Sequence, residues 1–378
     1  MAIPQCRHFN VCGGCQRQDL AYEAQLALKQ QRLQELLRNV VDEVPPLTVL
    51  AAPQHAYEYR NRIRLRLKCD DGAWRFGYSL PESSAFLPIE ECPIAAPLLL
   101  ECARQITQIV ARDRAAQRLL SATEELELMC NADQSRMIAT LLSTLRETTA
   151  SDSDAEHLLT ALRLSLPALQ SLALARVDPQ SRSLLQVLAG AGSEGLLYTL
   201  PQASYWVPRG AFFQVNRALL PEFADHVTKD AHGTLAWELF AGVGLFSRVL
   251  AQSFERLTAV ESSPHSFAEL KRSLKRCGPQ HRAVQATTQA FLERSVLERD
   301  RPNWVLADPP RAGLGERVCW LLEHLRAPRV RYVSCDPKTL SDDLARLRSS
   351  YRVDAVQMVD LFPQTTHIET IVQLSLRS

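Results

Sequence analysis

Short apolar runs alternate with helical stretches through the C-terminal half of the chain, and this alternation restricts the fold more than any other feature. Strands that are apolar throughout are buried on both faces of a sheet, and strands separated by helices pair in parallel. The pattern therefore predicts an α/β fold in which helices cover a parallel sheet. We expect its strands at residues 235–240, 257–260, 304–307 and 330–334.

The first predicted strand of this sheet ends in a glycine loop, with the sequence ELFAGVGLF from residue 238 to residue 246. Gly242 and Gly244 let the backbone pass close to a ligand at the carboxyl end of the strand, where open α/β sheets bind their cofactors. The next strand ends in Glu261, whose carboxylate can accept hydrogen bonds from both hydroxyls of a ribose. Residue 247 is Ser, so the third glycine of a dinucleotide fingerprint is missing. An adenosine cofactor without a bound pyrophosphate fits both facts.

Two further strands end in residues that can take part in chemistry. Asp308 follows the third predicted strand in the sequence DPPR, and Cys335 follows the fourth in the sequence SCDP. A DPP or NPP sequence at this position typically holds the reacting group of a methyl acceptor, although it can also be a plain turn with two prolines. A lone strand cysteine is usually a packing residue. Because Glu369 follows near the C-terminus, we expect Cys335 as a nucleophile and Glu369 as a proton acceptor at this edge of the sheet.

Cysteines cluster at the start of the chain. Cys6, Cys12 and Cys15 form the pattern C-x5-C-x2-C, and Cys92 is the natural fourth partner. Four thiolates suit either a tetrahedral zinc ion or a four-iron cluster, and spacing alone does not separate the two. Unliganded thiols are the remaining alternative. We expect a metal site that ties the N-terminus to the region around Cys92.

Basic residues occupy every second position from residue 60 to residue 68. In a strand these side chains would share one face while apolar residues pack on the other. Like charges on one face repel each other and must be offset, and a phosphate backbone could do this. A solvated sheet face is the plain alternative. The predicted nucleic-acid contact uses Arg60, Arg62, Arg64, Arg66 and Lys68.

Composition and length limit the alternatives. Lys and Arg total 43 against 42 Asp and Glu, so no overall field attracts polyanions. No signal sequence and no apolar run of about 18 residues is present, which predicts a soluble cytoplasmic protein with no membrane partner, and we expect a monomer. The 378 residues suggest two domains with a small appendage. We divide them into a Cys-rich segment with a helix at 1–44, a strand-rich central domain at 45–203 and an α/β domain at 204–378.

Together these residues resemble the S-adenosylmethionine-dependent RNA 5-methyluridine methyltransferases, and the resemblance covers nearly the whole chain. It rests on the glycine loop and on FFQVN at 212–216, DPPR at 308–311, SCDP at 334–337 and DLFPQTTHIE at 360–369. It implies a Rossmann-like methyltransferase domain beside a strand-rich α+β central domain. It also implies an enzyme that methylates C5 of a uridine in RNA.

The resemblance implies roles for individual residues. Cys335 would add to C6 of uracil as the nucleophile, and Glu369 would remove the C5 proton as the base. Thr287 stands where the family usually has Asn or Asp. The expected contacts to the methyl donor are Gln214, Phe240, Gly242, Gly244, Glu261, Thr287 and Asp308.

The N-terminal cysteine pattern is similar to the [4Fe-4S] segment of the ribosomal members of the family, which the transfer-RNA branch generally lacks. This favours 23S ribosomal RNA as the substrate and an iron-sulfur cluster over zinc. The chain begins five residues before Cys6, so we expect no N-terminal RNA-binding barrel of the OB type and an RNA site on the central domain. Methylation of transfer RNA, a cytosine-5 DNA methyltransferase and a non-catalytic metal-bearing RNA-binding protein are the alternatives.

Overall fold

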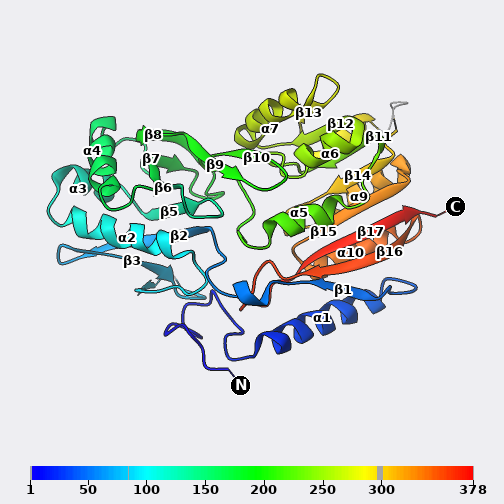
Figure 1. The fold of residues 1–378 in the computed structure, drawn as a ribbon, viewed down its shortest axis with the longest axis horizontal. Helices are drawn as coiled ribbons and strands as arrows, with labels where there is room; N and C mark the ends of the chain where they lie inside the picture. The colour runs from blue at the N-terminus through cyan, green and yellow to red at the C-terminus, as the bar shows by residue number, and fades with distance from the viewer. Residues whose placement is uncertain (1, 84, 296–300, 378) are drawn as a thin grey trace.

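Two large sheets organise the computed structural model, which describes residues 2–83, 85–295 and 301–377 (Figure 1). An eight-stranded sheet lies in the C-terminal domain, and a seven-stranded sheet lies in the central domain. A hairpin of β9 (Gly195–Thr199) and β10 (Ser204–Pro208) lies between them. The chain thus forms two lobes.

The larger sheet has the strand order β1 (Leu47–Leu50), β16 (Tyr351–Val359), β17 (Glu369–Leu376), β15 (Arg329–Ser334), β14 (Trp304–Ala307), β11 (Gly233–Leu239), β12 (Phe254–Glu261) and β13 (Arg282–Gln285). β11 pairs in parallel with β12 and β14, and β14 pairs in parallel with β15. These are the four strands that the apolar runs predict, so the parallel sheet is confirmed. β17 is different, because it runs antiparallel to both of its neighbours, β15 and β16.

Helices cover both faces of the larger sheet. One face packs against α5 (Leu220–Thr228), α6 (Ser247–Ser253) and α7 (Pro264–Cys277). The other packs against α1 (Tyr22–Arg38), α8 (Thr288–Ser295), α9 (Gly315–Leu325) and α10 (Pro337–Leu347). Successive residues of a strand point to opposite faces, so Ala236 joins the first core and Trp237 the second. No helix within the described residues is both long and apolar enough to cross a membrane. The predicted α/β architecture is confirmed.

The central domain packs three helices, α2 (Pro97–Val110), α3 (Arg114–Ser121) and α4 (Asp152–Arg163), on one face of its sheet. Its strand order is β4 (Phe86–Pro88), β3 (Ala73–Ser79), β2 (Arg62–Asp70), β5 (Glu125–Cys130), β6 (Met137–Ser143), β7 (Leu169–Val177) and β8 (Leu184–Gly192). In β2 the apolar side chains Ile63, Leu65 and Leu67 are buried and alternate with the basic ones, as predicted. This domain is the expected strand-rich α+β unit.

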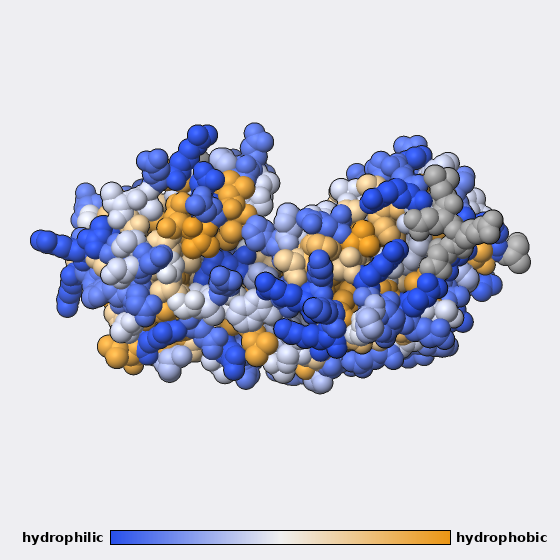
Figure 2. All heavy atoms as spheres, turned by 90° about the horizontal axis from the view of Figure 1, so that it is seen from above, coloured by the Kyte–Doolittle hydropathy of each residue, from blue (hydrophilic) through white to orange (hydrophobic). Residues whose placement is uncertain are grey.

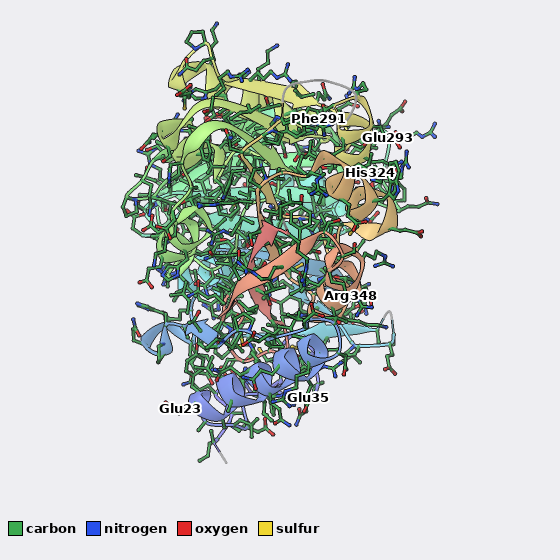
Figure 3. The ribbon with its side chains drawn as sticks, turned by 90° about the vertical axis from the view of Figure 1, so that its right-hand side faces the viewer. Glu23, Glu35, Phe291, Glu293, His324 and Arg348 are labelled. Atoms are coloured by element: carbon green, nitrogen blue, oxygen red, sulfur yellow. The ribbon has the colours of Figure 1, made fainter. Side chains whose placement is uncertain are left out.

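The N-terminal helix and strand pack on the C-terminal domain, which departs from the division predicted at residue 45. In α1 the side chains of Leu33 and Leu37 are fully buried in the core shared with α10. Glu23 and Glu35 lie on the exposed side of the same helix (Figure 3). β1 then joins the edge of the larger sheet in parallel with β16, and η1 (Pro53–His55) leads back toward the central domain. An edge strand of four residues carries too little sequence pattern to be assigned to either sheet.

A hollow separates the two lobes on the face shown in Figure 2. A cavity of about 660 Å³ lies between the lobes and is lined by β8 of the central domain and by α7 of the C-terminal domain. The lobes are therefore in contact along only part of their facing surfaces, next to the β9–β10 hairpin.

Replacing Leu33 with Ala should lower the free energy of unfolding by about 2–5 kcal/mol, because the buried side chain leaves a cavity between α1 and the larger sheet. Leu28 lies on the same helix with 45% of its surface exposed. Leu28→Ala should therefore change stability by less than about 0.5 kcal/mol. Urea unfolding followed by circular dichroism measures both, and equal losses would show that α1 does not pack in this way.

Candidate active site

Cys335 and Glu369 lie at the same end of neighbouring strands. Cys335 follows β15 directly, in the turn that leads into α10, and Glu369 is the first residue of β17. The two strands are antiparallel, with Ser334 opposite Thr370. The residue after Ser334 and the residue before Thr370 are therefore neighbours across the ladder. Asp336 fixes the turn, because its carboxylate accepts hydrogen bonds from two backbone N–H groups in the first turn of α10.

A cavity of about 440 Å³ lies over this pair. In addition to residues predicted from the sequence as catalytic or cofactor-binding, Arg60, Arg311 and His367 line its wall. Gly244, Glu261 and Thr287 do not line it. The other predicted catalytic and cofactor residues all do: Cys335, Glu369, Asp308, Gln214, Phe240 and Gly242.

Burial controls the protonation of the carboxyl groups at this cavity. Burial, reinforced by the Asp308 carboxylate, raises the pKa of Glu369 well above its usual range. Burial also raises the pKa of Asp308 to about 7. Glu369 is 2% exposed, and its Oε1 has no hydrogen-bond partner among the described residues. In its ionised form, a buried carboxyl group with a free oxygen can accept a proton from a ligand in the cavity.

The thiol of Cys335 is protonated at neutral pH in this structure. Burial is the main reason that its pKa rises to about 12; the charges of Glu369 and Asp308 act in the same direction, and the Arg311 guanidinium acts against them. Arg311 also approaches His367, with 3.5 Å between its Nη2 and the ring Nε2. A thiol with a pKa this high becomes a nucleophile only when it loses its proton.

The glycine loop after β11 presents its backbone to the cavity. Phe240 and Gly242 have φ angles of 62° and 57°. Glu261 holds the loop from the end of β12, because its carboxylate accepts the N–H of Gly242 at 2.8 Å and the N–H of Ser263 at 2.6 Å. A Cβ added to Gly242 would meet no other atom within 4 Å. The loop therefore leaves room for a ligand beside its backbone.

Two of the predicted cofactor contacts make local structural contacts instead of lining the cavity. A Cβ on Gly244 would lie 3.0 Å from Leu270 and 3.3 Å from Ser247, so the glycine allows close packing of helices on the sheet. Thr287 accepts the backbone N–H of Ala290 at 3.2 Å through its hydroxyl, in the first turn of α8. Their contact with a cofactor stays a prediction.

Glu238 was not identified from the sequence, although it begins the glycine loop. Burial raises its pKa to about 8. Its carboxyl group accepts a hydrogen bond from the Ser247 hydroxyl, and its Oε1 has no partner among the described residues. A carboxyl group inside an otherwise apolar strand was the available signal, because such residues are rarely buried without a function.

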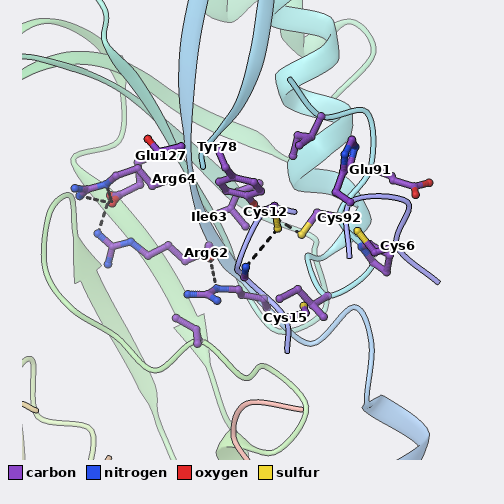
Figure 4. Close-up of a pocket in the computed structure, with 18 of the residues that line it drawn as sticks. Cys6, Cys12, Cys15, Arg62, Ile63, Arg64, Tyr78, Glu91, Cys92 and Glu127 are labelled. Carbon is purple, nitrogen blue, oxygen red and sulfur yellow. Dashed lines mark hydrogen bonds and ion pairs between the residues drawn. The ribbon is translucent and has the colours of Figure 1, made fainter. Parts of the chain in front are cut away.

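The N-terminal cysteines and Cys92 line a second cavity, of about 580 Å³ (Figure 4). Cys6, Cys12 and Cys15 come from the N-terminal segment, and Cys92 comes from the loop before α2. The Tyr78 hydroxyl donates to Cys92 Sγ at 3.8 Å. Burial raises the pKa of Cys15 to about 12. In the part of the chain that the structure describes, no three His, Cys, Asp or Glu side chains are arranged to hold a single metal ion.

Acidic residues within the protein offset most of the basic strand, so the argument from unbalanced like charges is wrong. Arg62 and Arg64 form ion pairs with Glu127 of the neighbouring β5, at 2.7 and 2.9 Å. Burial alone would raise the pKa of Glu127, but these two guanidinium groups lower it below its usual value. Lys68 pairs with Asp70 at 2.9 Å. The sequence correctly predicts that basic and apolar side chains alternate along β2, but it does not identify β5 as the neighbouring strand.

Arg60 differs from the other basic residues of this group. It precedes β2 and lines both the active-site cavity and the cysteine cavity. Phe212 also lines both, with 66% of its surface exposed. Arg66 instead lies over the ring of Phe86, at 5.9 Å from its centroid. The two cavities therefore adjoin at Arg60 and Phe212.

Comparisons with known proteins agree with this geometry. A family model described as tRNA (uracil-5-)-methyltransferase matches residues 21–276 and 283–377. The 23S rRNA (uracil(1939)-C(5))-methyltransferase RlmD of Chromohalobacter salexigens is 30% identical over 391 aligned positions, which cover 99% of this chain and 76% of the relative. RlmD of Halomonas elongata is also 30% identical, covering 98% of this chain and 76% of that protein.

A solved structure shares the fold over both domains. The tRNA (uracil-54, C5)-methyltransferase of Pyrococcus abyssi, in complex with S-adenosyl-L-homocysteine, superposes with a TM-score of 0.74 at 20% sequence identity. The likeness covers 96% of this chain and 85% of that chain. At this identity the likeness establishes the fold.

Replacing Glu369 with Gln should lower the pKa of Cys335, because the carboxylate is one of the charges that raise it. The pH midpoint for alkylation of Cys335, followed by mass spectrometry of its peptide, should fall. Cys69 is exposed and serves as the internal control for the alkylation reaction. An unchanged Cys335 midpoint in Glu369→Gln would contradict the proximity of the two groups.

Proposed function

The chain belongs to the tRNA (uracil-5-)-methyltransferase family, and from that membership we propose that it methylates C5 of a uridine in 23S ribosomal RNA, with Cys335 as nucleophile and Glu369 as base. As a member of the family it is an S-adenosylmethionine-dependent RNA methyltransferase that forms 5-methyluridine. The observation that carries the finer proposal is the meeting of a thiol and a buried carboxyl group across one strand ladder, in a cavity lined by the glycine loop.

The residues at the glycine loop fit a cationic adenosine cofactor. The buried carboxyl groups of Glu238 and Asp308 favour a positively charged ligand. Gly242 leaves open space beside the loop. Each oxygen of Glu261 already accepts one backbone N–H and can accept a second hydrogen bond, from a ribose hydroxyl. S-adenosylmethionine supplies an electrophilic methyl group when bound, and we propose Gln214, Phe240, Gly242, Gly244, Glu261, Thr287 and Asp308 as its contacts.

Cys335 makes C5 of uracil reactive. When the S–C6 bond forms, the C5=C6 π electrons move toward the C4 carbonyl and give an enolate, so that C5 can bond to the methyl group. The thiol must lose its proton at this step, because its pKa is raised to about 12. Arg311 favours the thiolate, since its positive charge opposes that rise.

Glu369 completes the reaction. After methylation, C5 carries both the methyl group and the original hydrogen. The Glu369 carboxylate takes that proton, the electrons of the C5–H bond re-form the C5=C6 bond, and the S–C6 bond breaks to release Cys335. Burial and the Asp308 carboxylate raise the pKa of Glu369, which makes its ionised form a stronger base than an exposed carboxylate.

The RNA must bring an unstacked uracil into this cavity, because a cysteine at a sheet edge cannot reach C6 inside a helix. Arg60 and Phe212 are the best candidates for contact with the flanking nucleotides. A guanidinium group can pair with a phosphate, and an exposed aromatic ring can stack on a base. Arg62 and Arg64 are weaker candidates, because Glu127 already neutralises them.

Ribosomal RNA is the first candidate substrate. Two relatives at 30% identity over nearly the whole chain are named as 23S rRNA (uracil(1939)-C(5))-methyltransferases. Transfer RNA is the second candidate, because the Pyrococcus abyssi protein with the same fold is named for uracil 54 of tRNA.

We also propose that Cys6, Cys12, Cys15 and Cys92 hold a [4Fe-4S] cluster, with zinc as the alternative. The four thiols line one cavity and are soft donors that favour iron-sulfur clusters and zinc. A four-iron cluster bonds to thiolates that surround it, whereas a single zinc ion needs four ligands in one small tetrahedron. Burial raises the pKa of Cys15, and a bound metal would favour its thiolate form.

The catalytic proposal predicts a trapped adduct. With methyl donor and 23S rRNA that contains 5-fluorouracil, the protein should form a covalent complex that survives denaturing electrophoresis. C5 of this base carries fluorine in place of hydrogen, so there is no proton to remove and the S–C6 bond is not released. Cys335→Ser should reduce the yield at least about 100-fold, because serine is a far weaker nucleophile at this pH. Cys69→Ser, an exposed cysteine outside the cavity, is the matched control and should react normally.

Three results would change these assignments. A full yield of adduct in Cys335→Ser would reject Cys335 as the nucleophile. An adduct with fluorinated transfer RNA but none with ribosomal RNA would reject the proposed substrate. A protein that binds RNA but forms no adduct with either would indicate a non-catalytic RNA-binding protein.

The cluster proposal predicts a coloured protein. After anaerobic purification, the protein should contain about four iron and four sulfide per chain and should absorb broadly in the visible range. Cys92→Ser should lose iron and colour, whereas Cys102→Ala, a buried packing cysteine of α2, should keep both. A colourless protein with one zinc per chain would replace the cluster with zinc.

A further inference from the structure

The 360–368 loop leads directly into Glu369 and carries two side chains that line the active-site cavity, Phe362 and His367. The loop forms no helix or strand of its own. Its position therefore depends on contacts from other parts of the chain. Many of these contacts come from the N-terminal segment at residues 16–29.

Lys29 of α1 makes a buried ion pair with Asp360, at the start of the loop. Its Nζ lies 2.6 Å from Asp360 Oδ1 and donates to the carbonyl oxygen of Phe362 at 3.0 Å. The Tyr22 hydroxyl donates to Asp360 Oδ2 at 2.7 Å. The side chains of Lys29 and Asp360 are 5% and 0% exposed. Because both charges are desolvated, any shift of the loop that separates them is costly.

Gln25 of the same helix holds the loop at Gln364. The N–H of Gln364 donates to Gln25 Oε1, and Gln25 Nε2 donates to Gln364 Oε1, both at 3.0 Å. The carbonyl oxygen of Gln364 accepts the N–H groups of Gln16 and Arg17 at 2.9 and 3.1 Å. Gln364 has a φ angle of 67°, which a residue other than glycine keeps only where its surroundings over-determine it. The N-terminal segment supplies those surroundings.

We propose that residues 16–29 form a clamp that positions the 360–368 loop for catalysis, with Lys29 and Gln25 as positioning residues for Glu369. The proposal rests on the proposed function, because it concerns the step in which Glu369 removes the C5 proton. Cys335 is held separately, by the turn that Asp336 caps. Loosening the clamp therefore slows proton removal more than it slows addition of Cys335 to the base.

The clamp is continuous with the cysteine site. Gln16 follows Cys15 directly, and its Oε1 accepts the N–H of Thr366 in the loop at 3.2 Å. Gln18 accepts the N–H of Cys6 at 3.0 Å through its Oε1. A metal bound at the cysteines would fix these first residues of the clamp and, through them, the loop before Glu369.

Two variants separate positioning from simple stabilisation. Lys29→Met leaves the Asp360 carboxylate buried without its cation and should lower the melting temperature. The double variant Lys29→Met/Asp360→Asn removes both charges and should recover much of that loss. Asp42→Asn is the control variant. It breaks an exposed ion pair of 2.6 Å between Asp42, which follows α1, and Arg377 at the C-terminus, and neither residue belongs to the 360–368 loop.

Two rates report the two chemical steps. Release of tritium from RNA labelled at C5 of uridine requires Glu369, whereas adduct formation with 5-fluorouracil RNA requires Cys335 but no proton removal. In Lys29→Met, and in the double variant, tritium release should fall at least about tenfold more than adduct formation. Gln25→Leu should show the same split, and the amides of Gln364 and Thr366 should then exchange with deuterium faster than in the wild type. Asp42→Asn should match the wild type in both rates.

Recovery of tritium release together with thermal stability in the double variant would overturn the clamp, because the ion pair would then serve folding alone. Equal losses of both rates in Lys29→Met and in Gln25→Leu would overturn it as well. A wild-type protein that neither forms the adduct nor releases tritium would instead refute the proposed function. The two failures are therefore distinguishable.

Discussion

The antiparallel insertion of β17 between β15 and β16 is the constraint on which the active site depends. The parallel strands β11, β12, β14 and β15 end at one edge of the sheet, so the residues that follow them gather there. A strand of opposite direction begins at that edge, and β17 begins with Glu369. In a parallel arrangement the same residue would lie roughly 20 Å from Cys335, at the other end of the strands.

Charge explains why this edge suits a cationic methyl donor. Asp308 and Glu369 line the active-site cavity, Glu238 is buried in β11, and burial raises the pKa of each of these three carboxyl groups. Without a cation nearby, burial favours their neutral forms, and a neutral Glu369 cannot accept a proton. A bound cation favours the ionised forms. The geometry therefore couples binding of a positively charged donor to ionisation of these carboxyl groups before the methyl group is transferred.

Sequence patterns predicted the parts of the molecule that local periodicity controls. The apolar runs predicted β11, β12, β14 and β15. The positions of Asp308 and Cys335 directly after two of these strands predicted that both lie at the carboxyl ends of the parallel strands. Pairing between distant strands carries no such signal. The partner of the basic residues, Glu127, lies on β5, and only the register of β2 and β5 brings it opposite Arg64. For the same reason β1 was assigned to the wrong domain, and the role of Glu238 depends on burial that a strand pattern alone does not specify.

The Lys29–Asp360 pair joins residues 331 positions apart, and this separation bears on how the site is held together. Bringing together two residues so far apart in the chain has a large entropic cost, but this cost grows slowly with their separation. A few buried contacts can therefore outweigh it once both domains are folded. Those contacts fix a loop with no regular structure whose final residue leads into Glu369. Loops of this kind sample several conformations unless something holds them. Under the proposed mechanism, the C5 chemistry depends on contacts from α1, which packs on the same sheet, and from Gln16, which directly follows Cys15.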